Sequence, residues 1–250
     1  MERPAPGEFF SYYFLFSTNA SGPIKSFARF LNERSAAAWM DDFAAGGRRI
    51  LFGLFKTIVL AGSLSPIAAK LGADGKEQLE LWFALYAYAL HLYFDFSGYT
   101  DIAVGLARLF GLRIEENFDW PYLKSNLREF WRSWHMSLTG FMREAVYIPL
   151  GGNRVGCARL YFNLTAVFVL IGLWHGLETH YLYWGLYHGA GMVAYRVWSS
   201  RREKAAVTPM RRAAGWLFTF HFVVFGWVLF ACETSRALDV YRILLTGGSL

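Results

Sequence analysis

Long uncharged stretches constrain this chain more than any other feature of its sequence. Five of them contain no Asp, Glu, Lys or Arg, namely Thr57–Ala69, Leu81–Phe94, Leu160–Leu177, Thr179–Tyr195 and Ala213–Cys232. A helix that crosses a membrane needs about 20 mostly apolar residues, with a range of about 17–25, and the last three stretches meet this requirement. The first two reach it only with charged neighbours, so buried or re-entrant segments are the alternative for them. We therefore predict an all-α fold, a polytopic bundle of transmembrane helices.

The composition agrees with a membrane protein and excludes several other classes. Hydrophobic residues make up 55% of the chain, aromatic residues 19% and charged residues only 18%. Soluble domains are typically about 25% charged. The aromatic content excludes a disordered tail, a coiled coil and a collagen-like repeat. The two cysteines, Cys157 and Cys232, cannot make a disulfide framework and match no metal-ligand spacing.

Basic residues orient the predicted spans. The segment Arg196–Arg212 contains six basic residues and a single acid, Glu203, and the positive-inside rule places it in the cytoplasm. The connection Leu177–His180 then lies on the opposite side, and the segment Arg143–Arg159 returns to the cytoplasm. The net charge of +6 suits a cytoplasmic membrane face as well as nucleic acid. We expect membrane lipid among the partners of the chain, and no nucleic acid.

The segment from Asn117 to Arg154 predicts an amphipathic helix. Asn126 followed by Glu129 fits a capping box, so we expect the helix to begin at Leu127. Its apolar face recurs at helical spacing through Leu127, Phe130, Trp131, Trp134, Leu138, Phe141 and Met142. His135 falls between this face and the one that carries Arg128 and Arg132. On the residues alone, an anchor at the membrane interface is the favoured interpretation.

Ionisable groups inside apolar segments are candidates for functional residues. His175 lies between Gly172 and Gly176 in the string GLWHG, and His188 occupies a similar place in GLYHG. Small residues let another helix approach closely, and burial favours the neutral imidazole that a general base requires. An interhelical hydrogen bond is the alternative role for each of these histidines.

Two acidic residues and the remaining histidines complete this set. Asp95 and Asp101 are expected to pair with an arginine or to cap a helix break at Gly98, with a role in substrate or proton binding as the alternative. The histidines His175, His180 and His188 do not share one helix face, so we predict no metal site.

Six strings in constant order point to a known family: FSTNASGPIKSFARF, FDFSGYTDIAVGLARLFG, ENFDWPYLKSNLREFWRSWHMSLTGF, YIPLGGNR, GLWHG and WGLYHG. On these strings the chain resembles the membrane-bound O-acyltransferases, most closely the bacterial alginate O-acetyltransferases and D-alanyl-lipoteichoic-acid transfer proteins. The resemblance implies that His175 is the signature catalytic histidine and His135 a second active-site histidine. We also expect Trp174, Trp134 and Arg132 to bind substrate.

The resemblance implies a reaction and its partners. We expect a multi-pass protein of the bacterial inner membrane that acetylates an exopolysaccharide or a teichoic acid, in alginate biosynthesis or a related process. The donor would be acetyl-coenzyme A, with no bound cofactor, and transfer would be direct or relayed through a periplasmic acetyltransferase. The alternatives are a D-alanyl or acyl carrier protein as donor, or a transporter or scaffold without chemistry.

The resemblance also bears on domain organisation. Family members carry further helices before and after the region matched here. We therefore expect residues 1–250 to form a single membrane-embedded acyltransferase domain, as a fragment that lacks N-terminal and C-terminal helices. The residues Gly140 and Glu144–Ala145 stand where relatives commonly have a tryptophan and an aspartate with an aromatic residue, so contacts at the active-site rim are expected to differ.

Overall fold

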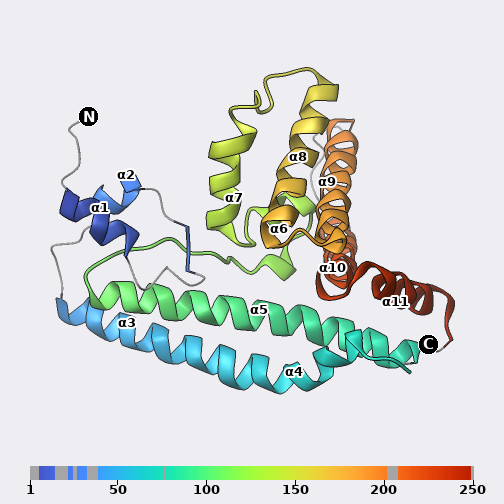
Figure 1. Cartoon of the computed structure of the whole chain (residues 1–250), viewed down its shortest axis with the longest axis horizontal. Coiled ribbons are helices and arrows are strands. Elements are labelled where there is room, and N and C mark those ends of the chain that lie inside the picture. The colour runs from blue at the N-terminus through green and yellow to red at the C-terminus, as the bar shows by residue number, and fades with distance from the viewer. Residues whose placement is uncertain are drawn as a thin grey trace. The chain divides into compact units, whose positions relative to one another are not determined.

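A computed structural model describes residues 6–14, 22–24, 27–32, 39–75, 77–201 and 208–248. The described residues form helices, and no strand is assigned among them (Figure 1). Part of the string Phe16–Phe30 and part of the basic segment Arg196–Arg212 lie outside these ranges. The chain divides into two compact units. The first unit comprises Met1–Ser63, His91–Asp119 and His135–Leu138, and the second comprises Leu64–Leu90, Trp120–Trp134 and Thr139–Leu250.

The first unit is built on two long helical segments. These are α3 (Trp39–Leu54), continued by a π-helical segment (Phe55–Ala61), and the second half of α5 (Gln78–Leu109). The short helices α1 (Pro6–Tyr13) and α2 (Phe27–Asn32) pack beside them. Together they bury a small core formed by Phe30, Ala103, Val104, Ala107 and Ile114.

Glycines allow α3 and α5 to approach each other closely. A Cβ atom placed on Gly53 would lie 2.5 Å from the carbonyl oxygen of Gly98, and one on Gly98 would lie 2.8 Å from that of Gly53. The same reciprocal contact recurs seven residues along each helix, between Gly46 and Gly105. Only residues without a side chain fit at this spacing, which is typical of packed helices in membranes.

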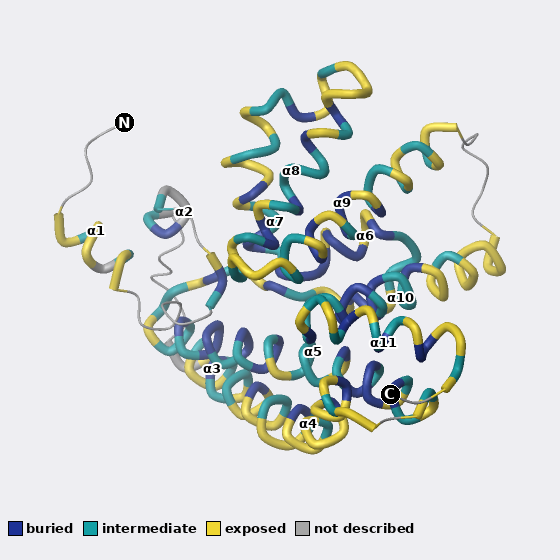
Figure 2. The backbone as a smooth tube through the Cα atoms, turned by 45° about the vertical axis from the view of Figure 1, so that its right-hand side comes forward, coloured by how far each residue is buried: buried dark blue, intermediate teal, exposed yellow. Residues whose placement is uncertain are grey.

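The second unit contains an antiparallel pair of long helices, α8 (Cys157–His175) and α9 (Thr179–Ser200), which lie side by side in both views (Figures 1 and 2). A Cβ on Gly185 would lie 2.5 Å from the carbonyl oxygen of Phe168, so this pair also packs backbone against backbone. The unit also contains most of α4 (Gly62–Ala68), a 3₁₀ turn (Ala69–Gly72), α6 (Leu127–Trp131), α10 (Pro209–Ala231) and α11 (Thr234–Thr246).

Among the described residues, three helical stretches are long and apolar enough to cross a membrane, namely Asp41–Gly72, Cys157–His175 and Pro209–Ala231. The last two confirm two of the predicted strong spans. The first contains Thr57–Ala69, which the sequence had suggested only as a weak span. Helix α9 falls short of the same apolarity, although its 22 residues would extend about 33 Å, which is enough to cross a hydrocarbon core of about 30 Å.

The amphipathic segment differs from its prediction. The predicted helix start is confirmed, because α6 begins at Leu127 and the side chain of Asn126 accepts a hydrogen bond from the backbone N–H of Glu129 at 2.9 Å. The expectation of one continuous helix is wrong. Helix α6 ends at Trp131, and α7 (Met136–Met142) begins after a break in which His135 adopts a left-handed φ of 44°.

Candidate active site

His175 lies at the last residue of α8, surrounded by aromatic rings of the second unit. Its ring centroid is 4.8 Å from that of Phe230, 5.8 Å from Trp184 and 6.1 Å from Tyr181, and the neighbouring Trp174 lies at 4.8 Å. The side chain is half-buried, and its ring nitrogens have no hydrogen-bond partner among the described residues. This environment leaves a ring nitrogen available to a bound molecule.

The chain reversal after α8 holds this histidine in place. Gly176 ends the helix, and its N–H donates to the carbonyl oxygen of Gly172 at 3.3 Å. Any side chain at Gly176 would collide with Glu178 and with the ring of Tyr181, whereas one at Gly172 would collide with the Tyr181 backbone. The two glycines therefore bring the first turn of α9 against His175, as the string GLWHG had predicted.

His188 is fully buried, and the ring of Trp184 packs against both His188 and His175. Its ring packs edge to face on Trp184 at 4.8 Å and on Trp131 at 4.9 Å. Neither ring nitrogen of His188, and neither indole nitrogen of Trp131 and Trp184, has a hydrogen-bond partner among the described residues. The interhelical hydrogen bond considered for His188 is therefore not formed within the described part of the chain. The aromatic layer it shares with His175 was not predicted.

His135 belongs to the first unit, where Asn117 fixes its position. The side-chain oxygen of Asn117 lies 3.3 Å from Nδ1 of His135 and accepts hydrogen bonds from the N–H and the hydroxyl of Ser137, at 3.1 and 2.6 Å. The backbone carbonyl of Asn117 accepts from the N–H of Met136. The Phe96 ring packs edge to face on the imidazole at 4.7 Å. All five contacts hold the segment between α6 and α7 in this conformation.

Asn117 is a candidate positioning residue that the sequence reasoning missed. It is completely buried, and it lies 18 positions before His135 in the chain. An asparagine directly before an aromatic and acidic string gives no local sign of such a role, because its partners His135, Met136 and Ser137 lie 18–20 residues further along the chain. The nearest sequence signal was that Asn117 opens the polar segment containing His135.

The three predicted substrate-binding residues have different environments. Trp174 is 60% exposed beside His175 and is accessible to a ligand. Trp134 is 4% exposed and packs 5.0 Å from Trp227, so it belongs to the core of the second unit. Arg132 is exposed at the end of α6 and forms no ion pair with a described residue. The structure therefore places Trp174 beside His175 and buries Trp134.

Asp101 has the structural role favoured by the sequence. It is buried in α5, where its carboxylate binds Nε of Arg49 at 2.7 Å and Nζ of Lys56 at 2.6 Å. Arg49 also pairs with the carboxylate of Glu116. Asp95 is exposed, and the hydroxyl of Thr57 donates to its backbone carbonyl oxygen at 3.5 Å.

Three other histidines make structural hydrogen bonds. The Nδ1 atoms of His91, His180 and His221 contact the carbonyl oxygens of Ala61, Leu229 and Leu217, at 3.0, 3.0 and 2.8 Å. His221 also contacts the hydroxyl of Tyr86 through Nε2 at 3.0 Å. Within the described ranges, no three His, Cys, Asp or Glu residues are grouped so that they could hold a metal ion.

These features define a helical membrane protein with one histidine in an aromatic surround at a helix end and another held by a buried asparagine. Residues 1–234 match the family model of the membrane-bound O-acyltransferases. The chain belongs to the membrane-bound O-acyltransferase family.

Similar proteins carry related names. The chain is 36% identical to a probable alginate O-acetylase of Azotobacter vinelandii over 235 residues, which cover 93% of this chain and 46% of that protein. It is 38% identical to a peptidoglycan O-acetyltransferase of Helicobacter pylori, over 89% of this chain and 42% of that protein. It is 32% identical to a teichoic acid D-alanyltransferase of Bacillus subtilis, over 88% and 60%. The chain spans about half the length of the curated relatives it matches.

Proposed function

We propose that this chain carries the catalytic histidines of a multi-pass O-acyltransferase of the bacterial inner membrane, which acetylates a hydroxyl of an exopolysaccharide or cell-wall polymer. The observation that carries the proposal is the environment of His175. Its ring is half-buried among four aromatic rings and has no hydrogen-bond partner among the described residues. A general base needs an imidazole nitrogen that a substrate hydroxyl can reach.

In the proposed reaction, a nitrogen of His175 accepts the proton of the acceptor hydroxyl while the oxygen attacks the carbonyl carbon of a thioester. The tetrahedral intermediate then collapses, the carbon–sulfur bond breaks, and the leaving thiolate takes the proton from the imidazolium. The products are an ester and a free thiol. A positioned general base contributes roughly 10²–10⁴-fold to the rate of such a transfer.

His135 is proposed to orient the acceptor or to stabilise the charge that develops on the carbonyl oxygen. Its Nδ1 is held by Asn117, so the imidazole ring has a fixed direction. Arg132, exposed at the end of α6, is proposed to attract an anionic donor such as acetyl-coenzyme A. Trp174, exposed beside His175, is proposed to contact the substrate at the rim.

The acyl group and the acceptor are argued from the relatives. Two of the relatives are named as O-acetylating enzymes of alginate and peptidoglycan, which favours an acetyl group and a polysaccharide acceptor. The relatives named teichoic acid D-alanyltransferases give the second candidate, in which a carrier protein delivers D-alanine. Both candidates use a thioester donor and the same histidine chemistry.

The test is acyl transfer in proteoliposomes that contain the protein, with radiolabelled acetyl-coenzyme A and a polysaccharide acceptor. We expect the His175→Ala variant to lose 10²–10⁴-fold in rate. The matched control is His221→Gln, because His221 bonds within its own helix and to Tyr86. A His175→Ala variant that inserts normally and transfers acetyl at the unmutated rate overturns the assignment.

The choice of donor separates the candidates. Transfer from acetyl-coenzyme A supports the acetyltransferase, and transfer only from a D-alanyl carrier protein supports the second candidate. Polymer export that persists in the His175→Ala variant, with no transfer from either donor in the unmutated protein, indicates a transporter or scaffold.

A further inference from the structure

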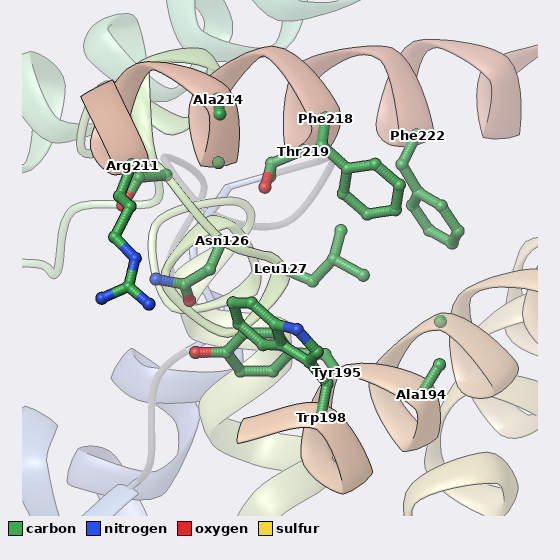
Figure 3. Close-up of a pocket in the computed structure, with 13 residues that line it drawn as sticks. Asn126, Leu127, Ala194, Tyr195, Trp198, Arg211, Ala214, Phe218, Thr219 and Phe222 are labelled. Carbon is green, nitrogen blue, oxygen red and sulfur yellow. The ribbon is translucent and has the colours of Figure 1, made fainter. Parts of the chain in front are cut away.

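The second unit contains a groove with a volume of about 500 Å³ between α9 and α10 (Figure 3). None of the four aromatic residues around His175 lines it. On α10 its lining residues recur at helical spacing: Arg211, Ala214, Gly215, Phe218, Thr219 and Phe222. On α9 they do the same: Gly191, Ala194, Tyr195 and Trp198. One continuous face of each helix therefore forms a wall of this groove, and Leu127 at the start of α6 also lines it.

The groove is polar at one end and apolar along the rest. In Figure 3 the guanidinium of Arg211, the amide of Asn126 and the hydroxyl of Tyr195 gather at one end. The rings of Phe218 and Phe222 line the other end. Such a distribution fits an amphiphile with a charged head and a hydrocarbon chain.

The charge at the polar end selects an anionic head. Arg211 is exposed, and no acidic side chain among the described residues pairs with its guanidinium. It lies in the first turn of α10, near the end of the basic segment Arg196–Arg212 that the positive-inside rule places in the cytoplasm. Basic pockets between helices on this side of a membrane are suited to anionic lipid head groups.

The length of the groove matches the hydrocarbon thickness of one membrane leaflet. From Arg211 to Phe222 the helix rises about 16 Å, at about 1.5 Å per residue. One leaflet contributes half of a hydrocarbon core of about 30 Å. Trp198 and Tyr195 lie at the polar end, where aromatic residues of membrane proteins meet the head groups.

We propose that this groove binds one anionic phospholipid of the cytoplasmic leaflet, with its phosphate at Arg211 and an acyl chain along Phe218 and Phe222. The small side chains Ala194 and Ala214 leave the space that the chain fills. Arg212, one residue further along α10, lines a different hollow with Leu123 and Trp216 and takes no part.

The proposal is tested with the purified protein, delipidated in detergent, by native mass spectrometry and by the thermal shift on adding phosphatidylglycerol. Arg211→Gln is expected to weaken phosphatidylglycerol binding about tenfold, the loss of one charge-assisted contact. Arg212→Gln is the matched control and is expected to bind as the unmutated protein does. Phosphatidylcholine is expected to bind at least about tenfold more weakly than phosphatidylglycerol.

Two further experiments test the binding of the lipid acyl chain and the source of the phosphate. Ala194→Phe and Ala214→Phe fill the groove and are each expected to abolish binding, with circular dichroism to confirm that the helices form. Glycerol 3-phosphate, the head without the chain, is expected to give no shift. Equal losses in Arg211→Gln and Arg212→Gln, unchanged binding in both phenylalanine variants, or a full shift with glycerol 3-phosphate would each overturn the proposal.

Discussion

The side-chain oxygen of Asn117 lies 3.3 Å from Nδ1 of His135. Because the same oxygen accepts a hydrogen bond from the backbone N–H of Ser137, its identity as the oxygen of the amide follows from the contact. An oxygen can only accept, so Nδ1 of His135 is the protonated nitrogen and the neutral ring carries its lone pair on Nε2. Asn117 therefore selects the tautomer of His135 as well as its position.

Changing Asn117 to Asp tests this positioning role. The carboxylate keeps the accepting oxygen but adds a negative charge beside the imidazole, which favours the protonated ring. If transfer needs the neutral ring, the acid limb of the pH–rate profile shifts to higher pH. Asn117→Ala removes the acceptor and should cost about 1–3 kcal/mol in the free energy of unfolding, since buried donors lose their partner. An unshifted profile in Asn117→Asp contradicts the role.

Removing the charge of Asp101 should strongly destabilise the first unit. Asp101→Asn leaves Arg49 and Lys56 without their shared buried carboxylate, and breaking a buried pair of this kind costs about 3–5 kcal/mol. Glu116→Gln is the control, because its carboxylate is 45% exposed and such pairs contribute about 0–1 kcal/mol. Denaturant unfolding in detergent measures both. Equal losses would show that Asp101 has no special structural role.

The close approach of α3 and α5 predicts that alanine substitutions at two glycines of α3 have different effects on the melting temperature. Gly53→Ala places a Cβ 2.5 Å from the carbonyl oxygen of Gly98, so the helices must separate and the melting temperature falls. Gly47→Ala meets nothing within 4 Å, and alanine is the better helix former by about 1 kcal/mol, so the melting temperature stays or rises. A stabilising Gly53→Ala variant would contradict the packing described.

Substitution of the two tryptophans predicted to bind substrate should have different effects, one on stability and the other on kinetics. Trp134→Ala leaves a cavity in the core of the second unit and should cost about 3–5 kcal/mol in the free energy of unfolding. Trp174→Ala removes an exposed ring beside His175, so we expect a higher KM with little change in stability. Thermal unfolding and transfer kinetics measure the two effects. A Trp174→Ala variant with unchanged kinetics excludes this ring from the site.

Chemical labelling of the two cysteines should show how the protein is oriented in the membrane. Cys157 is exposed at the start of α8, on the side predicted to be cytoplasmic, whereas Cys232 is buried. A membrane-impermeant maleimide should therefore label the protein in inverted vesicles and leave it unlabelled in intact cells. The Cys157→Ser variant should lose the label, and Cys232→Ser should keep it. Labelling of Cys157 in intact cells would reverse the orientation.

The site could be predicted from sequence only in part. The string GLWHG located His175 and the close approach at Gly172, because these depend on residues adjacent in the chain. The aromatic rings around His175 come from α9 and α10 as well as α8, and nothing local in the sequence pairs them. Asn117 escaped prediction for the same reason.

By itself, the sequence determined the helical membrane class, two of the spans and the start of α6 at Leu127, directly after its cap Asn126. Each depends on local physics: hydropathy over one span, or the capping of one helix turn. The tertiary structure alone decided that the amphipathic segment breaks at His135. Local periodicity favoured a continuous helix there, but hydrogen bonds to Asn117 and packing on Phe96 stabilise a left-handed residue that a helix would not permit.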